Sequence, residues 1–154
     1  MPKRRDLIRM SDDELHEFLH GRRTMNVATF NHDDTIHLVA MWYGFYEGKP
    51  AFETFSKSQK VRNLQRDRRI SVLVEDGDDY DKLRGVEIVG TAQVIDDQKI
   101  VMAIARNVVE RYMDVKDPND LDAVAAGLAN KRSAIVIDAD RIVSWDHTKL
   151  GGTY

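Results

Sequence analysis

The sequence predicts a mainly β domain with flanking helices, in which six antiparallel strands close into a small barrel. Six β-branched and apolar segments alternate with turns, and links of hairpin length imply antiparallel pairing. Closing such a sheet removes exposed strand edges. At 154 residues the chain has the length of one domain. We therefore expect a single domain over residues 1–154, with a core over 11–145 and a tail over 146–154.

Helical and strand spacing divide the N-terminal half into one helix and three strands. Ser11 and Glu14 form a capping box in front of an apolar stripe, which predicts a helix. Alternating apolar residues between turns predict strands. The second of these strands is apolar on both faces, which is typical of a strand with two occupied faces. The expected elements are a helix over 12–20 and strands over 24–30, 35–46 and 51–56.

The C-terminal half contains three more strands and three helices. Ser58 is a good N-cap for a short basic helix, in which Val61 and Leu64 lie one turn apart. Apolar residues at helical spacing from Val101 to Tyr112 predict a helix of about four turns. Pro118 begins a weaker, Ala-rich helix. The expected strands cover 70–74, 86–94 and 133–145, with an acidic loop over 76–84.

The composition is that of a globular protein and disfavours several other classes. Hydrophobic residues make up 42% of the chain and charged residues 32%. No apolar run reaches the roughly 20 residues of a membrane-spanning helix, and no apolar segment follows the basic N-terminus as in a signal peptide. Without cysteine there are no disulfides and no thiolate metal sites. We expect a cytoplasmic protein with no membrane partner.

A basic stretch over residues 54–69 stands out in a chain whose net charge is -3. It begins at the end of the third strand and continues into the short helix. A helix N-terminus supplies backbone N–H donors and lysines supply mobile cations, and a phosphate requires both. An isolated basic run is more often a solvated helix face, but the strand-to-helix position favours an anion site. The overall acidity and the lack of interleaved aromatic residues disfavour nucleic acid.

These residues resemble the split β-barrel flavoproteins of the pyridoxamine 5'-phosphate oxidase-like superfamily, and they are most similar to its F420-dependent branch. The resemblance covers residues 11–145, and its signature is TFSKSQKVRNL over 54–64 followed by RDRRISV over 66–72. Met-Trp-Tyr at 41–43 and Gly-Thr-Ala at 90–92 extend it. It implies the FMN-binding split barrel, and a homodimer with a flavin or deazaflavin at the interface.

The resemblance implies an F420-dependent oxidoreductase, which transfers a hydride between the deazaflavin and a small conjugated or heterocyclic substrate. The alternatives are an FMN-binding oxidoreductase of the same fold and a non-catalytic module that carries a flavin or haem. Arginines over 62–69 could attract the acidic oligoglutamate tail of F420, which favours F420 over FMN. The Arg-Leu-x-Pro element of true pyridoxamine phosphate oxidases is replaced by WDHTKL at 145–150, which disfavours vitamin B6 oxidation.

The same resemblance implies a set of cofactor-binding residues. Lys57 and Lys60 are expected to contact the phosphate, and Met41 and Trp42 to wall the ring, although aromatic residues on a strand are more often core. No side chain is singled out as a proton donor, because the cofactor itself carries the hydride. The complete expected set is Met41, Trp42, Thr54, Ser56, Lys57, Ser58, Gln59, Lys60, Val61 and Asn63.

Two other motifs suggest metals, and we interpret both as chance. The HEFLH run at 16–20 matches the H-E-x-x-H zinc motif. However, Gly21 follows at once, Phe18 and Leu19 belong to the packing stripe, and no third ligand lies at the expected offset. The acidic loop lacks the spaced ligands and terminal glutamate of a calcium-binding loop. We therefore expect no metal site.

Overall fold

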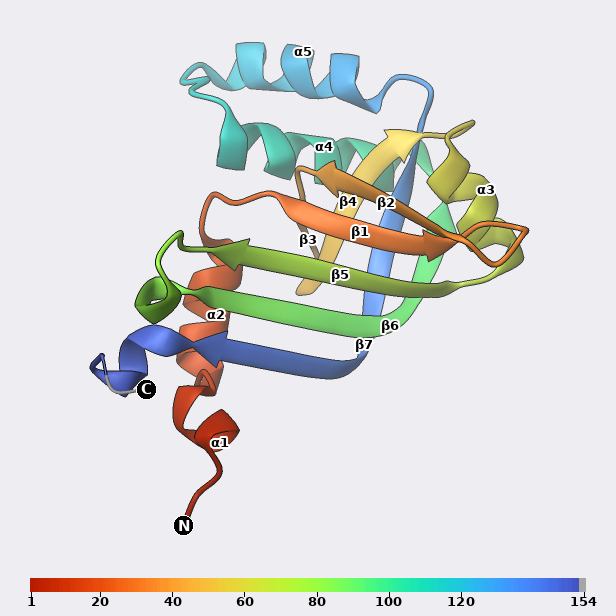
Figure 1. Ribbon diagram of the computed structural model, residues 1–154. Coiled ribbons are helices and arrows are strands. Elements are labelled where there is room, and N and C mark those ends of the chain that lie inside the picture. The colour runs from red at the N-terminus through yellow and green to blue at the C-terminus, as the bar shows by residue number, and fades with distance from the viewer. Residues whose placement is uncertain (153–154) are drawn as a thin grey trace.

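The computed structural model describes residues 1–152 and shows a seven-stranded antiparallel sheet that curls into a half-barrel (Figure 1). The strand order is β2-β1-β5-β6-β7-β4-β3. The strands are β1 (Met25–Phe30), β2 (Ile36–Met41), β3 (Gly44–Tyr46), β4 (Lys49–Phe55), β5 (Arg69–Asp76), β6 (Arg84–Ile95) and β7 (Arg132–Asp146). The helices are α1 (Arg4–Ile8), α2 (Asp12–His20), α3 (Gln59–Arg66), α4 (Gln98–Tyr112) and α5 (Pro118–Ala129), with 3-10 turns η1 (Tyr80–Lys82) and η2 (His147–Leu150).

The mainly β fold with flanking helices is confirmed, but the sheet has seven strands rather than six. The segment expected as one strand over 35–46 breaks after Met41, so that β2 pairs with β1 and β3 pairs with β4. At the break the Tyr43 side chain turns into the core, and its hydroxyl donates a hydrogen bond to the Leu19 carbonyl oxygen. The sheet keeps β2 and β3 as edges. It is therefore a half-barrel and not a closed barrel.

The predicted helix caps are present. The Ser11 hydroxyl accepts a hydrogen bond from the Glu14 backbone N–H, and the Glu14 carboxylate accepts one from the Ser11 N–H, so α2 begins with a full capping box. Ser58 caps α3 with its hydroxyl oxygen alone, which accepts a hydrogen bond from the Val61 backbone N–H. The sequence did not predict α1, which buries no residue and so carries no apolar stripe. Within the expected tail, 147–150 form η2, and residues 153–154 lie outside the described part of the chain.

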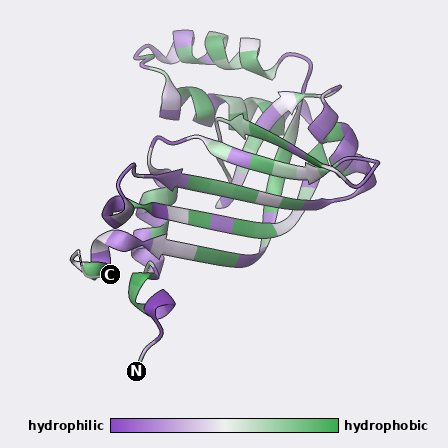
Figure 2. Ribbon diagram, in the orientation of Figure 1, coloured by the Kyte–Doolittle hydropathy of each residue, from purple (hydrophilic) through white to green (hydrophobic). Residues whose placement is uncertain are grey.

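Two hydrophobic clusters share β4 and β7. One fills the inside of the half-barrel, where Phe52 and Ile137 meet residues of β1, β5, β6 and α2. The other lies between the opposite face of β4 and β7 and the helices α4 and α5, which lie side by side at the top of Figure 1. Figure 2 shows the hydrophobic stretches along β5, β6 and β7. Because both faces of β4 are covered over its central part, the polar residues Glu53 and Thr54 are buried. None of the helices within residues 1–152 has the length and apolar character needed to span a membrane.

Candidate functional site

The junction between β4 and α3 is held against the start of β7. The Ser56 backbone N–H donates a 3.0 Å hydrogen bond to the Lys131 carbonyl oxygen. The Ser56 and Ser133 hydroxyl oxygens are 2.7 Å apart, and the Ser133 hydroxyl also donates to the Asp96 carboxylate. Ser56, which was expected to contact a cofactor, therefore already has partners inside the protein. These bonds fix where the first turn of α3 begins.

Lys60, in the first turn of α3, is buried without a counter-charge. The residue is 8% exposed, and its ammonium group has no hydrogen-bond or ion-pair partner among residues 1–152. Burial lowers the pKa of Lys60, and the nearby positive charge of Arg132 lowers it further. A buried cation that lacks an anion is costly. Lys60 is therefore a candidate for binding a negative group at the N-terminus of α3.

Arg132, the first residue of β7, lies opposite Phe55 and is a second cation, whose charge adds to the effect of burial in lowering the pKa of Lys60. Its guanidinium carbon lies 4.3 Å from the centre of the Phe55 ring. Its Nη1 atom lies 3.6 Å from the Glu53 Oε1 atom, an ion pair that is too long for a hydrogen bond. Glu53, Lys60 and Arg132 form what we name the charged cluster.

Two atoms of the charged cluster are buried with nothing to bond. They are Glu53 Oε2 and Arg132 Nε, neither of which has a hydrogen-bond partner among the described residues. Burial raises the pKa of the Glu53 carboxyl group, while the Arg132 charge opposes that rise. Buried polar atoms are nearly always bonded in folded proteins, so such exceptions require an explanation. A hydrogen-bond acceptor would satisfy Arg132 Nε, whereas Glu53 Oε2 is itself an acceptor and would require a donor.

The adjacent cavity, which we name the indole cavity, has a volume of about 350 Å³. This lies within the range of small-molecule sites. The Trp42 ring lies parallel to Tyr112, with 5.0 Å between the ring centres, yet Trp42 remains 42% exposed. One face of the indole is thus held by the protein and the rest is open to a ligand. The cavity is lined by Ala40, Met41, Trp42, Glu53, Leu128 and Arg132.

The structure brings together only part of the predicted cofactor-binding set. Met41 and Trp42 line the indole cavity, and Lys60, which is not among its lining residues, interacts with the charge of the lining residue Arg132. Lys57 and Gln59 are exposed on the surface. The remaining members are Ser58, which caps α3, and Thr54, Ser56, Val61 and Asn63, whose side chains are buried or bonded within the protein.

Asn63 is the clearest case of a predicted site residue whose side chain is used internally. It is fully buried, and its amide nitrogen donates hydrogen bonds to the Thr29 hydroxyl and to the side-chain oxygen Oδ1 of Asn31. Its own side-chain oxygen accepts from Gln59 and Arg66. These bonds attach α3 to β1. Asn63 therefore positions the helix that carries Lys60.

Sequence reasoning missed Glu53 and Arg132. A signal for Glu53 was available, because a glutamate interrupts the otherwise apolar run AFETF of β4. Arg132 offers no such signal. It reaches the site only because β4 and β7 pair with Phe55 opposite Arg132, a register that connects distant parts of the chain.

The arginine-rich part of the basic stretch is largely occupied by protein partners. Arg66 donates to the Phe30 carbonyl oxygen, and Arg68 donates to the Ala92 carbonyl oxygen. Arg69 forms hydrogen bonds with Asp67 that lower the pKa of this carboxyl group to about 2. Arg62 is exposed. The basic residues of stretch 54–69 thus form two groups. Lys60, in the first part of the stretch, has no ion-pair partner among the described residues, whereas most of the arginines in the second part are bonded within the protein.

The zinc-like motif is used for packing. The His16 and His20 rings stack with centres 4.0 Å apart, and His20 also stacks on Phe45 at 3.9 Å. The His20 Nδ1 atom lies 2.8 Å from the His16 carbonyl oxygen. Residues 1–152 contain no group of three or more His, Asp or Glu side chains that could hold a metal ion.

The geometry can be compared with that of known proteins. A family model described as pyridoxamine 5'-phosphate oxidase matches residues 11–146. The chain belongs to this family. Among curated proteins no match was found.

Solved structures share the fold of this chain. The conserved hypothetical protein Rv2991 from Mycobacterium tuberculosis is 40% identical and covers 99% of this chain and 95% of its own, with a TM-score of 0.90. An F420 reductase is 22% identical over 82% of this chain and 94% of its own, with a TM-score of 0.64. HutZ, the heme storage protein from Vibrio cholerae, is 13% identical over 86% of this chain and 94% of its own, with a TM-score of 0.68. The last two similarities show the shared fold alone.

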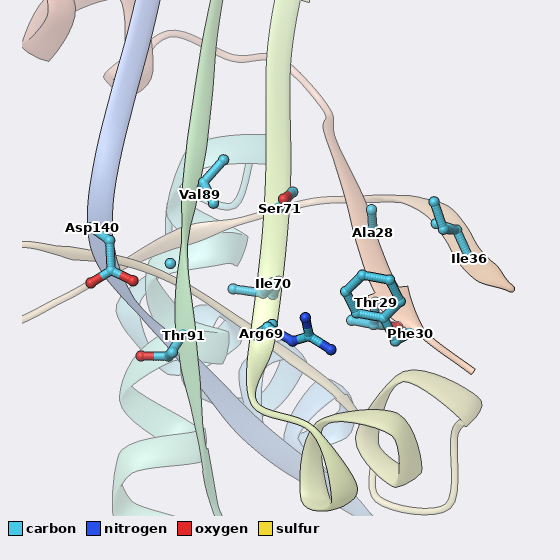
Figure 3. A pocket seen from close by; sticks show the side chains of 11 residues that line it. Ala28, Thr29, Phe30, Ile36, Arg69, Ile70, Ser71, Val89, Thr91 and Asp140 are labelled. Carbon is cyan, nitrogen blue, oxygen red and sulfur yellow. The ribbon is translucent and has the colours of Figure 1, made fainter. Parts of the chain in front are cut away.

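A second cavity of this family member lies on the sheet face that points away from the half-barrel core. We name it the outer groove, and its volume is about 370 Å³. Figure 3 shows Phe30 and Arg69 together at one end and Asp140 of β7 at the other. The Arg69 guanidinium carbon lies 4.5 Å from the centre of the Phe30 ring. The groove is lined by Ala28, Thr29, Phe30, Ile36, Arg69, Ile70, Ser71, Val89, Gly90, Thr91 and Asp140.

Proposed function

We propose that the protein is an F420-dependent oxidoreductase, which transfers a hydride between the deazaflavin and a small conjugated or heterocyclic substrate. The observation that carries the proposal is the charged cluster. Lys60 lies in the first turn of α3, Arg132 is near enough for its charge to lower the pKa of Lys60 beyond the effect of burial, and of the two cations only Arg132 has a counter-charge among the described residues. A phosphate group at this position would satisfy the unpaired cation and the helix N–H donors together.

The residues present fit a phosphorylated, ring-containing cofactor. Lys60 and Arg132 would hold the phosphate, while Met41 and the open part of Trp42 would contact the ring. When bound, such a cofactor supplies the hydride chemistry. The protein orients the ring, and the indole held on Tyr112 limits its movement. Because the ring carries the reacting electrons, the protein's main contribution is placement.

We further propose that the protein acts as a homodimer with the cofactor at the interface. The evidence is apolar surface that one protomer leaves uncovered: Ile36 is 65% exposed and Leu38 is 67% exposed. Both side chains lie on the outer face of the edge strand β2, in register with Phe30 and Ala28 of β1. Apolar patches of this kind mark interaction sites. The apolar outer groove continues this surface (Figure 3).

A cofactor titration tests the proposal. Purified protein is titrated with F420 and, separately, with FMN, and the quenching of cofactor fluorescence is followed. We expect micromolar F420 binding that weakens on the order of 100-fold in Lys60→Ala, because a buried charge-assisted contact is lost. Lys99→Ala, an exposed lysine on α4, is the matched control and should bind like the wild type.

The other outcomes separate the alternatives. Yellow protein that retains FMN through purification, with weaker F420 binding, indicates an FMN-dependent enzyme instead. Tight binding of a flavin or haem with no hydride transfer across a panel of conjugated substrates indicates a carrier module. The proposal fails if F420 does not bind, or if Lys60→Ala binds it as tightly as the wild type.

A further inference from the structure

We propose that Glu53 is a specificity-determining residue, which adapts the charged cluster to a singly charged phosphodiester and discriminates against a doubly charged phosphomonoester. The inference rests on the proposed function and deepens it, because the two candidate cofactors differ in this group. The phosphate of F420 links two alcohols and is a diester, whereas FMN ends in a monoester. Both phosphates are carried by a ribityl chain on closely similar ring systems, so at the phosphate group itself, apart from the acidic tail that F420 carries beyond it, the charge is what differs.

The position of Glu53 allows it to act on a bound phosphate. The residue is 5% exposed and lines the indole cavity. Its Oε1 atom lies 3.6 Å from Arg132 Nη1, while its Oε2 atom is buried without a partner. An anion that approaches Arg132 from the cavity therefore also approaches the carboxylate. Because the carboxylate can neither donate a hydrogen bond nor leave the site, it repels that anion.

The formal charge of the charged cluster balances that of a ligand with one negative charge. The charged cluster consists of Glu53 on β4, Lys60 on α3 and Arg132 on β7. The other residues that line the indole cavity, from β2, α5 and the turn after β2, are uncharged. Two positive charges and one negative charge leave the cluster at +1. A phosphodiester carries one negative charge, and a phosphomonoester carries about 1.5 to 2 at pH 7.

Because the site is buried, the difference in phosphate charge affects the binding energy. In water a surplus negative charge is screened, but between β4, α3 and α5 little solvent separates the groups. A diester would leave the occupied site neutral. A dianionic monoester would leave it negative, or would require Glu53 to take up a proton. Burial already raises the pKa of Glu53, so this proton uptake is available, although it costs binding energy at neutral pH.

Binding of four ligands tests the inference at pH 7.5. The ligands are F420, FMN, riboflavin, which lacks the phosphate, and riboflavin 5'-sulfate, which has the shape of FMN with one negative charge. In Glu53→Gln we expect FMN to bind about 10-fold more tightly, with riboflavin changed less than 2-fold and F420 less than 3-fold. Glu17→Gln, an exposed glutamate on α2, is the matched control.

The sulfate ester provides a test that needs no substitution. Wild-type protein should bind riboflavin 5'-sulfate about 10-fold more tightly than FMN, and a site indifferent to charge number would bind both equally. Equal affinities, or an unchanged ratio of FMN to F420 affinity in Glu53→Gln, would overturn the role of Glu53 while leaving the proposed function intact. Failure of F420 and all three flavins to bind would overturn both.

Discussion

The indole cavity and the outer groove have nearly the same volume, about 350 and 370 Å³, but they differ in how their charges are partnered. The indole cavity is lined by Glu53 and Arg132, each of which has one side-chain atom buried without a partner among the described residues, and the charge of Arg132 acts on Lys60, which is 8% exposed. In the outer groove, Arg69 is paired with Asp67 and stacked on Phe30, and the rest of the lining is mostly apolar. Volume alone does not separate the two. Unpaired buried charge favours a polar ligand, whereas a mostly apolar face whose charged residues, Arg69 and Asp140, are exposed favours a protein partner.

The largest expected effect concerns the apolar face beside the outer groove. Leu38→Asp places a charge on a surface that we propose is buried between protomers, and a buried unpaired charge costs several kcal/mol. We expect conversion of the dimer to monomer at micromolar concentration, measured by light scattering after size exclusion. Leu7→Asp, an equally apolar change on α1 where Leu7 is 50% exposed, should leave the dimer intact. A dimeric Leu38→Asp variant would place the interface elsewhere.

The next largest effect concerns Arg132. Arg132→Ala should weaken F420 binding about 100-fold and lower the free energy of unfolding by about 3 kcal/mol at pH 8, because Glu53 remains buried without its partner. The double variant with Glu53→Gln should recover most of the stability and none of the cofactor affinity. Chemical denaturation and fluorescence titration measure the two quantities. If stability and affinity recover together, the cluster serves folding alone.

A smaller effect is expected in the pH dependence of stability. The pKa of Glu53 is raised above its ordinary value of 4.5 in the folded protein, so the folded state holds this proton more tightly than the unfolded state. Its contribution to stability is therefore greatest at low pH and is lost as pH rises through the folded-state pKa. Glu53→Gln should remove this loss, so its stability advantage over the wild type should grow from pH 4.5 to pH 8. Denaturation curves at both pH values that show a constant difference would contradict this.

The smallest effect is expected for Arg69 in the outer groove. Its ion pair with Asp67 is exposed to solvent, and such pairs contribute little to stability. Arg69→Ala should leave F420 affinity within 2-fold of the wild type and the melting temperature unchanged. A large loss of cofactor affinity would show that the outer groove belongs to the cofactor site. It would also remove the distinction between the two cavities.

The sequence predicted well those features that depend on neighbouring residues. The capping box of Ser11 and Glu14 and the N-cap Ser58 were correct, because a cap requires only residues within one turn. The long apolar segment was wrong as a single strand. Its alternation continues past Met41, and only the docking of Tyr43 into the core turns the chain out of the sheet.

In the candidate site, too, features that depend on neighbouring residues could be predicted and features that depend on distant residues could not. Lys60 could be chosen from sequence, because its place at a strand-to-helix junction is a local property with a known affinity for anions. The use of Asn63 as a brace to β1 could not be foreseen, since its partners Thr29 and Asn31 lie on another strand and turn. The fates of Arg66, Arg68 and Arg69 likewise depend on which carbonyl oxygens and carboxylates the fold brings near.

The sequence by itself determined the mainly β class, most elements, the family and the basic junction that begins α3. The tertiary structure alone decided that Glu53 and Arg132 join Lys60, and that an indole held on Tyr112 opens toward them. Local patterns report hydrogen bonds and apolar spacing within a few residues. The charge balance of a buried site depends on the pairing of β4 with β7, and that register is set by packing between residues far apart in the chain.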